Sequence, residues 1–226
     1  MRTKTVVFFS VLLVSYLLLI KWIRPYYLTS HYLNSDKYVG HVEAWEHLEI
    51  SNSSLVFIGN SLVRGFETES FRIPTVKMAL GGDVLAGLQF RLSKICESKP
   101  KFLVINMGVN DIINGFGFSL DKLDKFVEEV ATCSSNTQLF LMSLGPQNLE
   151  PGFFTRPSRI QNELEMANSE IKALCHEKRL TYVDVYSLLS LNGKLKNEYS
   201  KDGLHLNSKG YRVWYEALCK AMNLRP

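Results

Sequence analysis

Glycine and proline are scarce in this chain, which has 14 Gly and 7 Pro among its 226 residues. A collagen-like or other fibrous repeat needs far more of both, so this class of protein is excluded. Charged residues make up 21% and hydrophobic residues 46% of the chain. This apolar content is enough for a core and excludes disorder as the main state. The length suits one domain, with or without a short extension.

Sequence motifs for metals and nucleotides are also missing. The chain has no Walker loop, no Gly-x-Gly-x-x-Gly and no convincing metal-binding cluster, so we expect no cofactor and no metal. The four cysteines lie far apart, with no Cys-x-x-Cys pair, at Cys96, Cys133, Cys175 and Cys219. We interpret them as small buried hydrophobic side chains. Their even number also permits disulfides in an oxidising compartment, but their spacing does not pair them.

The basic excess of the chain is confined to its N-terminal segment. The net charge is +4, and Arg2, Lys4, Lys21 and Arg24 are the only charged residues before position 35. Residues 35–226 are therefore formally neutral. A nucleic-acid partner would need a basic surface on the folded domain, so we expect none.

An uncharged apolar run extends from Thr5 to Ile20. As a helix this run rises about 24 Å, slightly less than the roughly 30 Å thickness of the hydrocarbon core. Lys21 can extend its charged end to the membrane surface, and its aromatic neighbours add to the apolar and interfacial length of the segment. No small-x-small cleavage site follows. We therefore predict a single-pass membrane anchor over residues 1–24, with a cleaved secretory signal as the main alternative and a buried soluble helix as a third. The flanking charges balance, but a short N-terminus before a long domain suggests an extracytoplasmic domain, periplasmic or lumenal.

The remaining chain divides into a connector, residues 25–53, with a helix near Val42–Leu48, and a main domain, residues 54–226. In the main domain, short apolar runs alternate with amphipathic patterns. The expected strands are 55–58, 75–80, 102–107, 138–142 and 180–185, and the expected helices are 84–97, 119–133, 158–178 and 207–222. This alternation predicts a three-layer α/β/α sandwich with a five-stranded parallel sheet of the flavodoxin-like type.

Polar residues follow the first three predicted strands and precede the last helix. Ser61, Gly82 and Asn110 follow strands one, two and three, and Asp202 and His205 precede the helix at 207–222. The carboxyl ends of parallel strands share one edge of the sheet, which is where ligands bind in such folds. Together these residues offer a hydroxyl, backbone N–H groups, an amide and an Asp–His pair, which are the parts of an acyl-transfer site.

These four segments resemble the four sequence blocks of the SGNH hydrolases, also called GDSL esterases, over about residues 54–222. The blocks are Gly59-Asn60-Ser61, Gly81-Gly82-Asp83, Gly108-Val109-Asn110-Asp111 and Asp202-Gly203-Leu204-His205. The second block and the Leu-His-Leu-x-x-x-Gly-Tyr run are most similar to the platelet-activating-factor acetylhydrolase and lysophospholipase-like branch. Asn60 departs from the family, which has Asp at this position, and removes a charge beside the serine.

The resemblance implies a metal-independent serine esterase. Ser61 would be the nucleophile, His205 the general base and Asp202 the residue that orients it. The backbone N–H of Ser61, Gly82 and the side chain of Asn110 would form the oxyanion hole. Each residue also has a purely structural interpretation: Ser61 as a helix N-cap, Asp202 as a turn former, Gly82 in a strand-to-helix turn and Asn110 in an Asx turn. Asp83 and Asp111 are interpreted as local caps.

The substrate stays open between a lysophospholipid, another lipid and an O-acetylated carbohydrate. One alternative is a membrane-anchored O-acyltransferase that uses the same triad. Another alternative is a catalytically silent binding protein of the envelope. Asn60, which replaces the family's Asp, is the only residue that favours this alternative. We expect the loop 144–159, with Phe153, Phe154, Arg156 and Arg159, to overhang the site. The oligomeric state is not predicted.

Overall fold

The computed structural model describes Ser15, residues 27–151 and residues 156–224. The chain divides into two compact units, Met1–His41 and Val42–Pro226. The predicted membrane anchor at residues 1–24 lies, apart from Ser15, outside the described residues and stays a prediction. In the part of the chain that the structure describes, no helix combines the length and apolar character needed to cross a bilayer.

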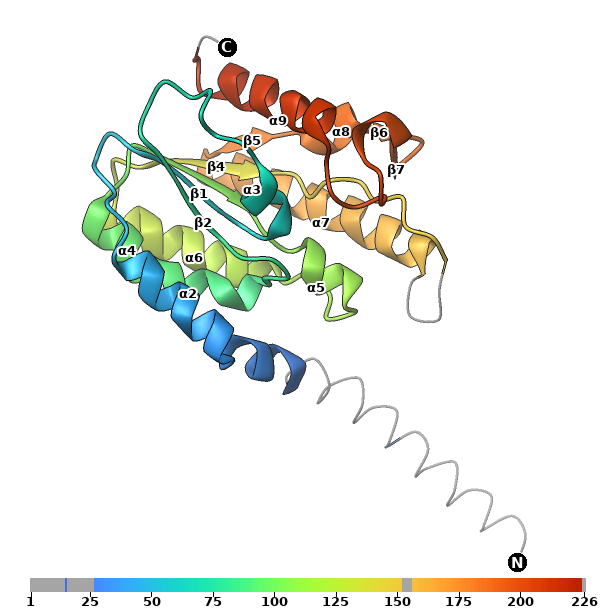
Figure 1. Ribbon diagram of the computed structural model, residues 1–226, viewed down its shortest axis with the longest axis horizontal. Coiled ribbons are helices and arrows are strands. Elements are labelled where there is room, and N and C mark those ends of the chain that lie inside the picture. Colours follow the sequence, from blue (N-terminus) through green and yellow to red (C-terminus); the bar gives the residue numbers. More distant parts are fainter. Residues whose placement is uncertain (1–14, 16–26, 152–155, 225–226) are drawn as a thin grey trace, which may run out of the picture. The chain divides into compact units, whose positions relative to one another are not determined.

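A five-stranded parallel sheet forms the centre of the larger unit, which confirms the predicted fold class (Figure 1). Its strand order is β2-β1-β3-β4-β5. The strands are β1 (Leu55–Gly59), β2 (Thr75–Ala79), β3 (Phe102–Asn106), β4 (Gln138–Met142) and β5 (Thr181–Val183). At the carboxyl end of β1, Gly59 lies opposite Ala79 of β2 and Asn106 of β3. The segments that follow these three strands therefore start next to one another.

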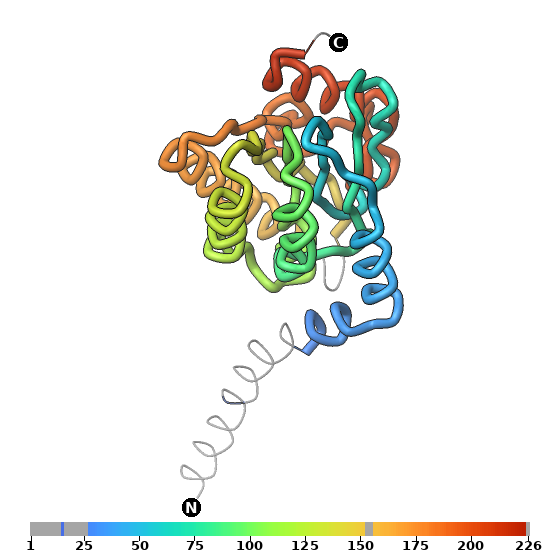
Figure 2. The backbone as a smooth tube through the Cα atoms, turned by 90° about the vertical axis from the view of Figure 1, so that its left-hand side faces the viewer, coloured from blue at the N-terminus to red at the C-terminus, as the bar shows by residue number. Residues whose placement is uncertain are grey.

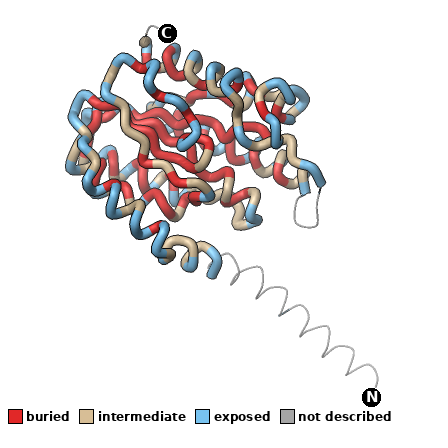
Figure 3. The backbone as a smooth tube through the Cα atoms, in the orientation of Figure 1, coloured by how far each residue is buried: buried red, intermediate tan, exposed pale blue. Residues whose placement is uncertain are grey.

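Helices cover both faces of the sheet, with α4 and α6 on one face and α9 on the other (Figures 1 and 2). Every residue of β1 and β3 is buried, as expected for parallel strands covered on both sides (Figure 3). The helices of the larger unit are α3 (Ser61–Gly65), η1 (Leu85–Arg91), α4 (Leu92–Ser98), α5 (Val109–Ile113), α6 (Leu120–Cys133), α7 (Pro157–Lys178), α8 (Val185–Leu189), η2 (Asn197–Tyr199) and α9 (Ser208–Ala221).

Several elements differ from the sequence-based expectation. The helix expected near Val42–Leu48 is α2 (Asp36–Glu46), which begins earlier because the Ser35 hydroxyl caps it by accepting from Tyr38 N. Residues 84–97 begin as the 3₁₀ helix η1 before α4 follows. Strand β5 is short because Asp184 ends it by capping α8.

A small antiparallel hairpin, β6 (Ser190–Leu191) and β7 (Lys194–Leu195), was not expected. Its turn residues Asn192 and Gly193 have φ of 51° and 75°. Asn-Gly is the pair that two-residue hairpin turns prefer, so this turn could have been found from the sequence.

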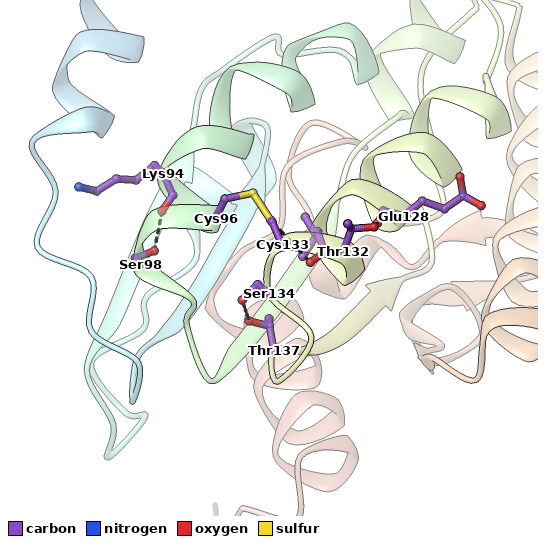
Figure 4. Close-up of a disulfide and its surroundings, with 9 residues drawn as sticks. Lys94, Cys96, Ser98, Glu128, Thr132, Cys133, Ser134 and Thr137 are labelled. Atoms are coloured by element: carbon purple, nitrogen blue, oxygen red, sulfur yellow. Dashed lines mark hydrogen bonds between the residues drawn. A yellow bond between two sulfur atoms is a disulfide. The ribbon is translucent and has the colours of Figure 1, made fainter.

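A disulfide joins Cys96 of α4 to Cys133 at the end of α6 (Figure 4). The interpretation of the cysteines as buried hydrophobic residues is therefore wrong for this pair, and it is confirmed for Cys175 and Cys219, which are buried free thiols. The physical reason is the contact between α4 and α6, which brings together two residues that are 37 positions apart in the chain.

Candidate active site

Ser61 is the first residue of α3, directly after β1. Asn60 is the cap of this helix, because its Oδ1 accepts a hydrogen bond from Leu62 N at 3.0 Å. The interpretation of Ser61 as the helix N-cap is therefore wrong, because the capping bond comes from Asn60 and not from the Ser61 hydroxyl. The turn before it requires glycine, since a Cβ on Gly59 would lie 2.1 Å from Cγ2 of Val63.

The amide of Asn60 keeps the capping bond that an aspartate at this position could make, without the charge. Asn60 is fully buried, and its Nδ2 has no hydrogen-bond partner within the described residues. The departure from the family's Gly-Asp-Ser therefore leaves the position of Ser61 intact and leaves one buried donor unpaired.

Ser61, His205 and Asp202 form a continuous chain of hydrogen bonds. The Nε2 atom of His205 lies 3.0 Å from the Oγ of Ser61, which is 144 positions away in the sequence. The Nδ1 atom of the same ring lies 2.7 Å from Oδ2 of Asp202. The structure thus brings together the three residues that the sequence singled out, in the order hydroxyl, imidazole, carboxylate.

The turn that carries Asp202 and His205 is held by its own hydrogen bonds. Oδ1 of Asp202 accepts from the backbone N–H groups of Leu204 and His205, at 2.9 and 2.7 Å. Gly203 has a φ of 75°, and a Cβ there would lie 2.0 Å from the carbonyl oxygen of Asn148. Only glycine satisfies both the left-handed backbone and this close approach.

Ser200 supports the same turn and was missed in the sequence. Its Oγ lies 2.7 Å from the carbonyl oxygen of His205 and 3.2 Å from Oδ1 of Asp202, and it accepts from Gly203 N at 3.0 Å. A lone serine upstream of the Asp-x-x-His block carries no sequence signal, because its role depends on the fold of the turn.

Two opposing effects act on the pKa of Asp202. Burial raises it, but the hydrogen bonds from the His205 ring and from the Leu204 and His205 N–H groups outweigh burial, and the pKa of Asp202 falls below its usual range. The carboxylate is therefore ionised at neutral pH and able to accept the Nδ1–H of His205.

Gly82 and Asn110 follow β2 and β3, the two strands that flank β1. Gly82 is exposed and has a φ of 82°, the left-handed conformation that favours glycine. The Nδ2 of Asn110 donates to the carbonyl oxygen of Asp83 at 2.7 Å, which links the segment after β3 to the segment after β2. An amide nitrogen carries two hydrogens, and the described residues provide Asn110 with this one acceptor. The second N–H is thus available to a ligand.

Asp83 and Asp111 hold the loop after β2 from two sides. The Asp83 carboxylate forms a fully buried ion pair with Arg91, and its Oδ1 accepts from Val84 N at 2.9 Å. Oδ2 of Asp111 accepts from Leu85 N, at the start of η1, at 3.0 Å. Burial raises the pKa of Asp111 to about 7, and the bond from Leu85 N opposes the shift. The interpretation of Asp83 and Asp111 as caps agrees with these bonds. The helix that Asp111 caps is η1, which follows β2 and belongs to a different segment of the chain.

Tyr211 connects α9, the helix that follows His205, to α3, the helix that begins with Ser61. Its hydroxyl donates to the carbonyl oxygen of Leu62 at 2.9 Å, and its ring stacks on Phe66 with centroids 5.6 Å apart. A pocket of about 360 Å³ lies between the segment after α3 and α9, with Phe66, Tyr211 and Tyr215 among its walls. Ser61, Asp202 and His205 do not line it.

The loop 144–159 is described only in part. Phe153 and Phe154 lie outside the described residues, so their predicted position over the site stays a prediction. Arg159 is in α7, where Nη1 pairs with Glu163 at 2.7 Å and Nη2 donates to the carbonyl oxygen of Ile112 at 3.1 Å. Arg159 therefore ties α7 to α5, the helix of Asn110.

In residues 27–151 and 156–224, no group of three or more His, Cys, Asp or Glu side chains is placed to hold a metal ion.

Residues 57–213 match the sequence model of the GDSL-like Lipase/Acylhydrolase family. The chain belongs to this family. This match confirms the resemblance to the GDSL esterases that the four sequence blocks indicated.

Several solved structures share the fold of this chain. A GDSL-like lipase from Bacteroides thetaiotaomicron is 21% identical with a TM-score of 0.67, and the match covers 84% of this chain and 97% of that one. A catalytic mutant of an acetylxylan esterase from Geobacillus stearothermophilus is 14% identical with a TM-score of 0.58, over 78% and 97% of the two chains.

Among curated proteins, the N-acylneuraminate cytidylyltransferase of Streptococcus agalactiae is 23% identical over 173 residues. The match covers 74% of this chain and only 38% of the relative. The chain thus spans well under half the length of the curated relatives it matches.

Proposed function

We propose that this hydrolase is a serine esterase that works through an acyl-enzyme, with Ser61, His205 and Asp202 as its catalytic triad. The observation that supports this proposal most directly is the hydrogen-bond chain from Ser61 Oγ through both ring nitrogens of His205 to Asp202. A serine hydroxyl is a weak nucleophile unless a base removes its proton, and His205 Nε2 lies within the distance that this transfer needs.

In the first half of the reaction, Ser61 Oγ attacks the ester carbonyl and its proton passes to His205 Nε2. Asp202 keeps the other ring proton on Nδ1 and stabilises the imidazolium. The negative charge on the former carbonyl oxygen is met by the Ser61 and Gly82 N–H groups and by the second N–H of Asn110. As the tetrahedral intermediate collapses, His205 gives its proton to the leaving alcohol. Water then repeats these steps on the acyl-enzyme and releases the acid.

For the substrate we favour an acyl or acetyl ester of a carbohydrate over a long-chain lipid ester. The His205 and Asp202 side chains are 47% and 55% exposed, so the triad stands at an open surface that can admit a bulky alcohol. The curated relatives carry the name of an enzyme of N-acylneuraminate, an acidic sugar, and the fold is shared with an acetylxylan esterase. A lysophospholipid is the second candidate, since a membrane anchor would place the site near lipid.

We also propose that residues 1–24 anchor the protein in a membrane and that the catalytic domain is extracytoplasmic. The apolar run from Thr5 to Ile20 supports the anchor. The Cys96–Cys133 disulfide supports the location, because structural disulfides persist in oxidising compartments and are rare in the cytosol.

Labelling of the full-length chain with a fluorophosphonate probe tests the mechanism, because only an activated serine reacts. We expect labelling of the wild type, and its loss in Ser61→Ala and His205→Ala. Ser208→Ala is the matched control, because Ser208 is also the first residue of a helix but is not a hydrogen-bond partner of the His205 ring within the described residues. Labelling that persists in Ser61→Ala would contradict the proposal.

Two further measurements separate the remaining alternatives. If the rate of acyl transfer to an added sugar exceeds the rate of ester hydrolysis, the protein is the O-acyltransferase. For the anchor, we expect the full-length chain to sediment with membranes and to resist extraction by high salt. Recovery of a mature chain that begins after residue 24 would show a cleaved signal instead.

A further inference from the structure

Arg64 lies beside the candidate oxyanion hole. It is three residues after Ser61 in α3, a spacing that places two side chains on the same face of a helix. Its guanidinium reaches the segment after β2, where a Cβ added to Gly81 would lie 3.4 Å from Cζ and Nη1 and 3.5 Å from Nη2. Because these three distances are nearly equal, the guanidinium lies flat over Gly81, the residue before Gly82.

The guanidinium of Arg64 has no carboxylate partner in the part of the chain that the structure describes, and the residue is exposed. Arg91, Arg159 and Arg212 differ, since each forms an ion pair. A guanidinium that presents one face to the backbone keeps its N–H edge free for a ligand. Because Gly81 directly precedes Gly82, the Arg64 guanidinium lies near the candidate oxyanion hole.

The position of Arg64 is fixed by its backbone. Its N–H donates to the carbonyl oxygen of Asn60 at 2.9 Å, and its own carbonyl oxygen accepts from Lys77 Nζ at 3.1 Å. Lys77 also donates to the carbonyl oxygen of Phe66 at 2.7 Å, so this β2 lysine holds the end of α3 against the sheet. It also brings a second positive charge close to Arg64.

We propose that Arg64 is a specificity residue that binds a carboxylate or phosphate on the substrate, next to the ester that Ser61 attacks. The planar fork of arginine matches both groups by paired hydrogen bonds. The inference rests on the proposed esterase function and narrows its substrate to anionic esters. A sugar acid would supply the carboxylate, and a lysophospholipid would supply the phosphate.

The test compares two matched pairs of esters on the full-length protein. One pair is the acetyl ester of a sugar acid and that of the corresponding neutral sugar. The other is a lysophospholipid and a monoacylglycerol with the same chain. We expect the wild type to prefer the anionic member of one pair, and that pair identifies the source of the anion. In Arg64→Met, we expect the anionic-to-neutral ratio of kcat/KM to fall roughly 10- to 100-fold, mainly through KM, as for a lost charged hydrogen bond.

Two further variants separate recognition from structure. Arg64→Lys keeps the charge without the fork, so its ratio should lie between those of wild type and Arg64→Met. Arg72→Met removes an equivalent exposed charge before the amino end of β2, away from the site, and should leave the ratio unchanged.

The outcomes also separate this inference from the proposed function. Neutral esters hydrolysed without any anionic preference, or an equal loss on both members of each pair in Arg64→Met, would overturn the role of Arg64 alone. Absence of hydrolysis of all four esters, together with no fluorophosphonate labelling, would overturn the esterase proposal and this inference with it.

Discussion

Asp202→Asn is the substitution that tests the proposed triad most sharply, because it keeps the turn and reverses one hydrogen bond. Oδ1 of Asp202 accepts from the N–H groups of Leu204 and His205, and an amide oxygen can accept both. The amide nitrogen would then face His205 Nδ1, where Oδ2 now lies at 2.7 Å. Because this nitrogen is a donor, Nδ1 would have to become an acceptor, and the ring proton would move to Nε2. A protonated Nε2 cannot accept the proton of Ser61.

The expected loss in kcat is about 10⁴-fold, as in a serine protease with the same change, which corresponds to about 5 kcal/mol of transition-state stabilisation. The cost in folding stability should be small, no more than about 1 kcal/mol, because the Asp202 and His205 side chains are 55% and 47% exposed and water screens the lost ion pair. The substitution should therefore separate catalysis from folding.

The assay is kcat and KM on one ester from pH 4 to 9, with thermal melting of each variant. The wild type should show no break from Asp202 in this range, because its pKa lies below the usual value for Asp. Asp184→Asn is the control, since Asp184 also accepts a backbone N–H, that of Ser187, but caps α8 away from the triad. A kcat of Asp202→Asn within tenfold of wild type would refute the tautomer reasoning. So would an equal loss in Asp184→Asn.

Three further predictions concern the oxyanion hole, a buried acid and the disulfide. Asn110→Ala should lower kcat by roughly 10²–10³ with a much smaller change in KM, and an effect on KM alone in steady-state kinetics would instead make Asn110 a substrate contact. The pKa of Asp111 is about 7 in the folded state, above its unfolded value near 3.8. Between these two pH values the folded state binds one more proton than the unfolded state. Asp111 therefore lowers the free energy of unfolding as the pH rises from about 4 to 7. Asp111→Asn should flatten that part of a melting-temperature profile, and an unchanged slope would contradict the assignment. Replacing both Cys96 and Cys133 by Ser should lower the unfolding free energy by about 4 kcal/mol in urea titrations, for a loop closed over a separation of 37 residues. A loss below about 1 kcal/mol would contradict this loop-closure contribution.

The order and type of the main elements followed from the sequence because they depend on local patterns. The apolar runs ending at Gly59 and near Asn106 are typical of strands buried on both faces, and the structure contains them within a residue of the expected ends. The 3.6-residue spacing of Leu123, Phe126 and Val130 likewise predicted α6. The short helices α3, α5 and α8, of five residues each, were missed, since they are too short to show a period and are held by caps and tertiary contacts.

By itself, the sequence determined the fold class, the family and the residues from which the candidate site is built, because turn chemistry and the four blocks are local. Only the tertiary structure decided which side chains meet. Examples are the pairing of Cys96 with Cys133, the cap that Asn60 makes in place of Ser61, and the position of the Arg64 guanidinium over Gly81. Such contacts depend on how helices and loops pack across the sheet. Tyr211 contacts Leu62, which is 149 positions away, and Arg64 lies near Gly81 in another segment, so neither contact leaves a trace in a local pattern. Ser200 contacts residues only a few positions away, but its role depends on how the turn folds.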